Sequence, residues 1–195
     1  METHFARLAR SESLTDRQKR LVIGSLLGDG FLVKTTRGFA FRVNHGLAQK
    51  FYVDWKYEEL KNFVNSQPRQ TQNCYYFRTI SHSYFDFLRS EFYVGRTKRL
   101  PFELIEQFLD GFLLAVWIMD DGSRDKQQLR VNTQCFSKEE LEMLRDLLRA
   151  KFGLETKLNQ DKRYFRIRFS AQSMQTLMGL IRPHILPDML YKLPL

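Results

Sequence analysis

The stretch Leu26-Leu27-Gly28-Asp29-Gly30 is the key to this sequence, because Ile118-Met119-Asp120-Asp121-Gly122 repeats its pattern 92 residues later. Three further motifs recur in the same order. Residues 42–44 (Arg-Val-Asn) and 76–78 (Tyr-Phe-Arg) reappear 88 residues on, and a Lys shortly before Leu-Pro closes each half, at Lys98 and Lys192. Ordered recurrence at a nearly constant spacing indicates an internal duplication.

The boundary between the two copies falls in a short polar segment, Arg96 to Pro101, where the proline interrupts regular structure. We therefore expect an N-terminal repeat over residues 1–96, a linker over 97–101 and a C-terminal repeat over 102–195. Each repeat is predicted to run helix, two strands, helix, strand, helix. The expected class is α+β, with two pseudo-symmetric αββαβα-type repeats packed through their motif helices.

Local signals place these elements. A capping box at Thr15 and Gln18 starts a motif helix that Gly30 stops, and a second capping box at Ser137 and Glu140 starts a helix in the other half. In the first repeat, strands are expected at 31–35, 39–44 and 75–80, with helices at 48–65 and from residue 84. A strand is expected at 163–170 in the second. Alternating residues give these strands one apolar and one polar, basic face.

The composition indicates which class of partner the protein binds. The 31 Lys and Arg against 22 Asp and Glu give a net charge of +9, which favours a polyanion such as nucleic acid. The longest apolar run, 112–119, is shorter than the roughly 20 residues that a membrane span needs. The N-terminus shows no secretory or transit signal, so we expect a protein that is not secreted and works in an organelle (mitochondrion or chloroplast) or the bacterial cytoplasm.

The repeated aspartates, Asp29 and Asp121, are the candidate catalytic residues. Gly24 and Gly28 leave a groove on the first motif helix, and close packing of the two motif helices would bring Asp29 and Asp121 together. Paired carboxylates repel, and a hard cation such as Mg²⁺ neutralises them and activates water for phosphodiester hydrolysis. The two cysteines and four histidines have no zinc-site spacing, which leaves oxygen ligands. Lys98 and Lys192 would stabilise charge on the reacting phosphate.

The basic strand faces and turns are predicted to contact DNA, through phosphates for affinity and base edges for specificity. Alternatively, Gly-Asp-Gly is simply a helix stop and the arginine-bearing faces are the wet sides of sheets. The predicted DNA-binding residues are Lys34, Arg37, Arg42, Asn44, Arg78, Arg124, Arg130, Asn132, Arg166 and Arg168.

The segments 23–30 and 115–122, with their repeated context, resemble the LAGLIDADG homing endonucleases, most closely the monomeric two-motif branch. The resemblance implies that the motif helices form the domain interface and that each half lays a saddle-shaped antiparallel sheet in the DNA major groove. It implies metal ligation by Asp29 and Asp121 and by the carbonyls of Gly28 and Asp120, with Lys98 and Lys192 as the basic residues. The halves depart from each other at His45 and Gln134, which are candidates for orienting a water molecule.

Together these observations predict a monomer that cuts both strands of double-stranded DNA at a non-palindromic site of about 20 base pairs. Mg²⁺ is the expected cofactor, with Mn²⁺ or Ca²⁺ able to substitute in binding. The alternatives are an intron maturase with RNA as its partner, a DNA-binding protein of the same fold without cleavage, and a structural RNA-binding protein. The duplicated acids count against the last of these.

Overall fold

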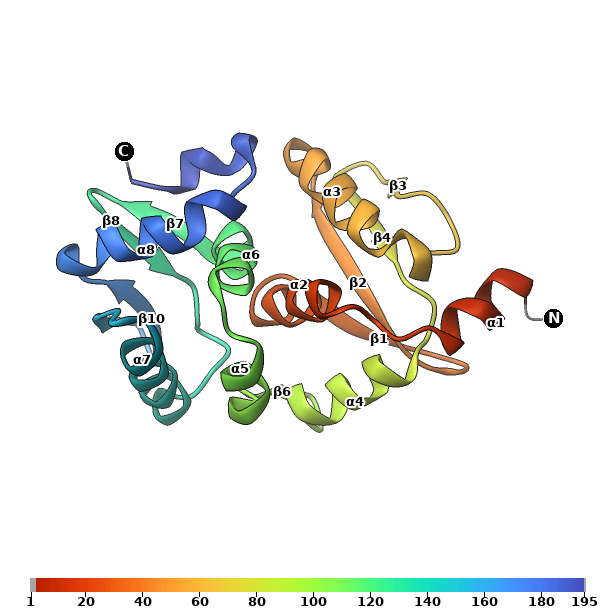
Figure 1. Cartoon of the computed structure of the whole chain (residues 1–195), viewed down its shortest axis with the longest axis horizontal. Helices are drawn as coiled ribbons and strands as arrows, with labels where there is room; N and C mark the ends of the chain where they lie inside the picture. The colour runs from red at the N-terminus through yellow and green to blue at the C-terminus, as the bar shows by residue number, and fades with distance from the viewer. Residues whose placement is uncertain (1–2, 195) are drawn as a thin grey trace. The chain divides into compact units, whose positions relative to one another are not determined.

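The computed structural model describes residues 3–194 and divides into two compact units (Figure 1). Unit 1 comprises Met1–Val22 and Asp29–Glu91, and unit 2 comprises Ile23–Gly28 and Phe92–Leu195. The boundary therefore crosses the first motif helix, whose C-terminal end groups with the second unit. Within residues 3–194, no helix is long and apolar enough to cross a membrane.

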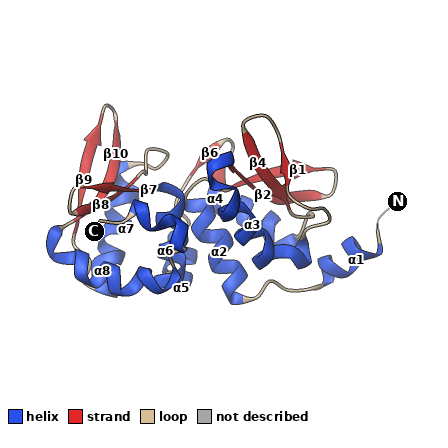
Figure 2. Ribbon diagram, turned by 90° about the horizontal axis from the view of Figure 1, so that it is seen from above, coloured by secondary structure: helices blue, strands red, loops and turns tan. Residues whose placement is uncertain are grey.

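Unit 1 is built on a four-stranded antiparallel sheet of order β1-β2-β4-β3. Figure 2 shows its helices gathered on one side of this sheet. The elements in chain order are α1 His4–Ser11, α2 Asp16–Leu27, β1 Phe31–Thr35, β2 Gly38–Gly46, η1 Leu47–Gln49, α3 Lys50–Leu60, η2 Lys61–Phe63, β3 Arg69–Gln70, β4 Cys74–Arg78 and α4 Ser83–Phe92.

Unit 2 repeats this plan, with a second antiparallel sheet of order β7-β8-β10-β9. A small hairpin, β5 Tyr93–Val94 with β6 Thr97–Lys98, precedes it. The remaining elements are α5 Phe102–Phe108, α6 Gly111–Asp121, β7 Gly122–Asp125, β8 Gln128–Val131, α7 Lys138–Phe152, β9 Thr156–Asp161, β10 Tyr164–Phe169, η3 Ala171–Ser173, α8 Met174–Ile181, η4 Arg182–His184 and η5 Pro187–Lys192.

The predicted α+β fold of two repeats is confirmed. Each four-stranded sheet has one strand more than predicted, and the hairpin of β5 and β6 was not predicted either. The additional strands, β3 and β9, both lie at the edge of their sheet. An edge strand has one neighbour and little need for an apolar face, so Thr-Lys-Leu-Asn-Gln-Asp at 156–161 lacks the strong alternation of a central strand. The expected helix over 48–65 is also shorter, because 3₁₀ turns at η1 and η2 flank α3.

Both predicted capping boxes are present. At the start of α2, the Thr15 amide donates to Oε1 of Gln18 at 3.0 Å and the Gln18 amide donates to Oγ1 of Thr15 at 3.2 Å. At the start of α7, Ser137 and Glu140 exchange the same two bonds at 2.7 and 3.2 Å. These pairs satisfy amides that have no partner within the helix, and so fix where each helix begins.

Candidate active site and nucleic-acid interface

The two motif helices meet inside unit 2, where the Ile23–Gly28 end of α2 packs on α6. A Cβ atom at Gly24 would lie 2.8 Å from the Leu113 carbonyl oxygen, and one at Gly28 would lie 2.5 Å from Cβ of Asp120. Side chains cannot occupy that space, so glycine permits this backbone approach. Residues 112–120 of α6 are buried throughout. The predicted packing of the motif helices is therefore confirmed.

The two lysines occupy matching positions at the ends of the motif helices. Nζ of Lys98 donates to the Gly28 carbonyl at 3.3 Å, and Nζ of Lys192 donates to the Asp120 carbonyl at 2.7 Å. Gly28 and Asp120 each stand immediately before a motif aspartate, and Lys192 also donates to the Met119 carbonyl at 2.5 Å. Carbonyls at a helix C-terminus lack intrahelical donors and attract cations, which explains why each lysine is held there. The duplicated sequence pattern thus corresponds to a duplicated contact.

Glu140 and Phe136 support Lys98. The Leu100 amide donates to Oε1 of Glu140 at 2.8 Å, which anchors the segment just after Lys98 to the start of α7. Nζ of Lys98 lies 5.8 Å from the centre of the Phe136 ring, within cation–π range. The capping box identified Glu140 from sequence but gave no sign of this second role, because its partner is 40 residues away.

The motif acids differ in their surroundings. The Asp29 side chain is 48% exposed, and its Oδ2 lies 3.7 Å from Nδ1 of His45, whose side chain is buried in unit 1. Asp121 is half-buried, and its carbonyl accepts a hydrogen bond from the Asn132 amide at 3.1 Å. Asn132 therefore ties the end of α6 to the end of β8 through its backbone.

The two candidate water-orienting residues are used differently. His45 faces Asp29 and packs its ring 5.2 Å from that of Tyr52. Nε2 of Gln134 instead donates weakly to Oδ2 of Asp161 at 3.4 Å. Only His45 is thus in contact with a motif aspartate of its own unit, and the halves are unequal at this position.

Cys135 lies in the field of Lys98 and Asp121. Desolvation of the thiol raises the pKa of Cys135. The positive charge of Lys98 lowers this pKa, and the Asp121 carboxylate raises it by less than Lys98 lowers it. The thiolate is the nucleophilic form of cysteine, and a raised pKa keeps it scarce at neutral pH. The arrangement therefore does not favour a covalent mechanism through Cys135.

The donor atoms at the helix ends fit a hard divalent cation. Within unit 2 these are the carboxylate of Asp121 and the carbonyl oxygens of Gly28 and Asp120, and oxygen is the ligand that Mg²⁺ prefers. The Gly28 and Asp120 carbonyls each accept a lysine hydrogen bond, and a carbonyl oxygen has two lone pairs.

Basic residues share one face of each sheet. In unit 1, Arg42 of β2 pairs with Arg78 of β4, and Asn44 pairs with Tyr76. In unit 2, Arg130 of β8 pairs with Arg168 of β10. Directly paired residues point to the same face, and here the opposite face carries buried Phe41, Val43, Phe77 and Ile167. The predicted alternation between a core face and a basic face is present in both units.

Two predicted DNA-binding residues point the other way. Lys34 pairs with Phe39, and Arg124 pairs with Leu129, so both lie on the apolar side of their sheets. Arg37 is exposed in the turn between β1 and β2. Strand register decides which face of a sheet a residue joins, although both Lys34 and Arg124 are exposed. We leave these two out of the proposed DNA-contacting surface.

The fold is duplicated, and each motif helix ends at or near an aspartate whose preceding carbonyl accepts a lysine hydrogen bond. The model of the LAGLIDADG DNA endonuclease family matches residues 19–177, and the chain belongs to this family. The homing endonuclease I-WcaI, solved bound to its DNA recognition sequence, superposes with a TM-score of 0.86 at 26% identity over 97% of this chain and 90% of that one.

Two curated relatives extend the comparison. A probable intron-encoded DNA endonuclease of Mycosarcoma maydis is 36% identical over 126 residues, which cover 62% of this chain and 93% of that protein. The cytochrome b mRNA maturase bI2 of Saccharomyces cerevisiae is 28% identical over 197 residues, covering 89% of this chain and 46% of that protein. The chain spans about half the length of the first relatives it matches, which include Protein RecA of Mycobacterium gastri.

Proposed function

We propose that this protein is a site-specific, metal-dependent endonuclease that cuts both strands of double-stranded DNA at a long non-palindromic site. The observation that carries the proposal is the matched pair of lysine contacts. In a member of a DNA endonuclease family, Lys98 and Lys192 each bind the carbonyl that precedes a motif aspartate. A protein that had lost cleavage would have no need to keep both charged groups in this arrangement.

In this proposal, Asp29 and Asp121, together with the carbonyls of Gly28 and Asp120, hold Mg²⁺. Gly28 and Asp120 contact each other in unit 2, and each aspartate follows one peptide later, about 3.8 Å along the chain. The bound ion would supply Lewis acidity and a more acidic water. The two ammonium groups stabilise negative charge that develops on the phosphate. His45, whose Nδ1 lies 3.7 Å from Oδ2 of Asp29, would orient a water molecule in the first half.

The basic sheet faces bind DNA. Arg42, Asn44 and Arg78 in one unit, and Arg130, Arg166 and Arg168 in the other, would contact phosphates and base edges in a groove. Two modules that each follow a groove for about one turn cover roughly 20 base pairs. Because the two faces differ in sequence, the half-sites differ too, and one chain acts as a monomer inside the cell.

Replacing Lys192 by methionine is expected to lower the rate of DNA cleavage by roughly 10²–10³-fold, the usual cost of removing one group that stabilises transition-state charge. DNA affinity should change far less. Lys151→Met is the matched control, because Lys151 also donates to a backbone carbonyl, that of Glu106, at 2.8 Å on an exposed surface of unit 2. The cleavage rates of both variants are measured under single-turnover conditions. Equal rates for the two variants would remove Lys192 from the active site.

The activity itself is tested with a randomised DNA library. The purified chain is incubated with the library in Mg²⁺, and the cut ends are sequenced. We expect double-strand breaks centred on one long asymmetric consensus, and no cutting in EDTA. Cutting without sequence preference, or no cutting in Mg²⁺ or Mn²⁺ by a folded protein, contradicts the proposal.

A second candidate function is assistance of intron RNA folding, which the match to the yeast maturase favours. The duplicated acids and lysines are not needed for it. Splicing of the host intron that depends on the purified protein, without nicking of DNA in Mg²⁺, would establish the maturase role instead.

A further inference from the structure

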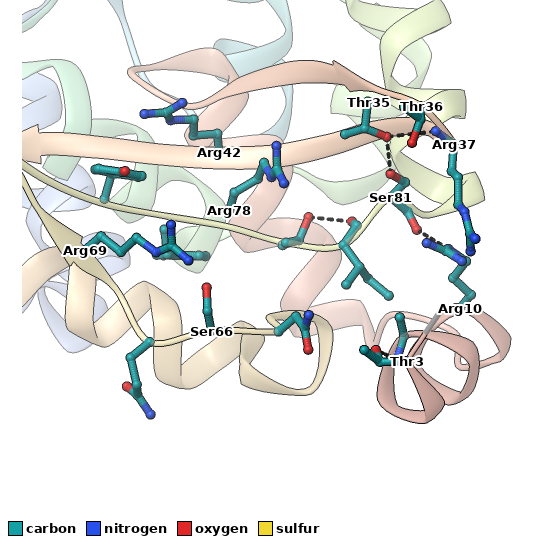
Figure 3. A pocket seen from close by; sticks show the side chains of 17 residues that line it. Thr3, Arg10, Thr35, Thr36, Arg37, Arg42, Ser66, Arg69, Arg78 and Ser81 are labelled. Carbon is teal, nitrogen blue, oxygen red and sulfur yellow. Dashed lines mark hydrogen bonds between the residues drawn. The ribbon is translucent and has the colours of Figure 1, made fainter. Parts of the chain in front are cut away.

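The basic face of the unit 1 sheet continues into a pocket of about 740 Å³ (Figure 3). Its walls come from α1, the segment before β3, strand β4 and the turn between β1 and β2. All 17 lining residues lie in the described part of the chain and none of them is acidic. Five are arginines: Arg10, Arg37, Arg42, Arg69 and Arg78.

Hydrogen bonds fix the rim of this arginine pocket. Nε of Arg10 donates to the Ser81 carbonyl at 3.0 Å, so the guanidinium of α1 is held against the end of β4. The Ser81 and Thr35 hydroxyls are 2.5 Å apart, and the Arg37 amide donates to Oγ1 of Thr35 at 3.1 Å. Figure 3 shows this chain of contacts along one side of the pocket. The pocket is therefore organised before any ligand arrives.

The arrangement of charge calls for an anion. Arg42 and Arg78 are direct cross-strand partners, and like charges placed opposite each other destabilise a sheet. Arg69 is paired with Tyr76 on the adjoining strand, and the Arg42 guanidinium lies 4.4 Å from the same ring. Stacking orients Arg42 but leaves its positive charge in place.

In unit 2, carboxylates of the protein itself offset the repulsion between paired arginines. Arg130 and Arg168 are also cross-strand partners, but Arg168 forms an ion pair with Asp125 at 3.4 Å. Its neighbour Arg166 forms one with Asp161 at 2.6 Å. The equivalent surface of unit 1 has no carboxylate lining its described pocket. The repulsion between Arg42 and Arg78 is therefore not offset by a pocket carboxylate, and a bound anion would relieve it.

We propose that Arg10 of α1 extends the DNA-contacting face of unit 1 through this pocket and binds a backbone phosphate of the DNA at the outer part of the site. This inference rests on the proposed function only in taking DNA as the substrate. Guanidinium groups bind phosphate oxygens through paired N–H donors, and the hydroxyls of Thr35 and Ser81 add polar lining. Arg10 precedes the residues that the family model matches, 19–177.

The test combines Arg10→Gln with DNA in which single phosphates are replaced by uncharged methylphosphonates. Affinity is measured in Ca²⁺ for every position on both strands of the site recovered from the library. We expect one or a few positions at which neutralisation weakens the wild-type protein roughly tenfold or more but scarcely affects the Arg10→Gln protein. For each protein, the affinity for the modified duplex is divided by the affinity for the unmodified duplex. This ratio removes any general loss of affinity caused by the substitution.

Arg7→Gln is the matched control, since Arg7 lies exposed on α1 outside the pocket. It should respond to every methylphosphonate as the wild type does. If no position distinguishes Arg10→Gln from Arg7→Gln while the wild type cuts its site, Arg10 does not contact the substrate backbone. If the wild type neither binds nor cuts DNA, the proposed function itself has failed, so the two failures are distinct.

Discussion

Asp29→Asn is expected to abolish double-strand cleavage, with a fall in rate of roughly a thousandfold or more, while the protein still binds its DNA site. The amide has the size of the carboxylate but lacks the negative charge that attracts and holds a divalent cation. The side chain is 48% exposed, so its replacement removes no core packing. Cleavage is measured under single-turnover conditions in Mg²⁺, and binding is measured in Ca²⁺.

Asp146→Asn is the control for this change of charge, because Asp146 on α7 is 71% exposed and forms a surface ion pair with Arg149. Pairs of this kind contribute little to stability, and the control should cut at the wild-type rate. An Asp29→Asn protein that cuts as fast as the Asp146→Asn protein would overturn the assignment of Asp29. Loss of binding in Ca²⁺ would show that Asp29 has a structural role instead.

Much of the fold could be predicted because its signals are local. The capping pairs Thr15 with Gln18 and Ser137 with Glu140 lie three residues apart and mark two helix starts. Strand β1 occupies the predicted residues 31–35. Asp29 and Asp121 are each weak signals alone. The duplication indicated that these two distant residues belong to equivalent positions. It also selected Lys98 and Lys192, whose carbonyl contacts mirror each other.

The remaining features depend on contacts between distant residues. Lys34 and Arg124 have a suitable charge, but their pairing with Phe39 and Leu129 places them on the apolar side of their sheets. The strand register that decides this cannot be read from either residue alone. Arg10 had no local pattern to mark it, because its place in the pocket depends on Ser81, 71 residues away. Strands β3 and β9 were not predicted because β3 has only two residues and the sequence of β9 lacks strong apolar alternation.

Gly24→Ala is expected to destabilise the protein, although alanine is ordinarily the better helix former. The new Cβ would lie 2.8 Å from the Leu113 carbonyl oxygen and 3.0 Å from Cβ of Val116. The first of these is a backbone atom of α6, so no rotamer change relieves it. Overpacking of this kind typically lowers the free energy of unfolding by about 1–3 kcal/mol, and it should outweigh the gain in helix propensity.

Gly179→Ala separates this steric cost from the effect of alanine on a helix. Gly179 lies within α8, and a Cβ atom there would have no neighbour within 4 Å. Alanine at this position should raise the free energy of unfolding by about 0.4–1 kcal/mol. Denaturant unfolding of both variants gives the comparison. If Gly24→Ala is as stable as Gly179→Ala, then α2 and α6 do not pack closely at Gly24, and the contact that sets Gly28 against Asp120 loses its support. The proposed metal site depends on that contact, so the same measurement also bears on catalysis.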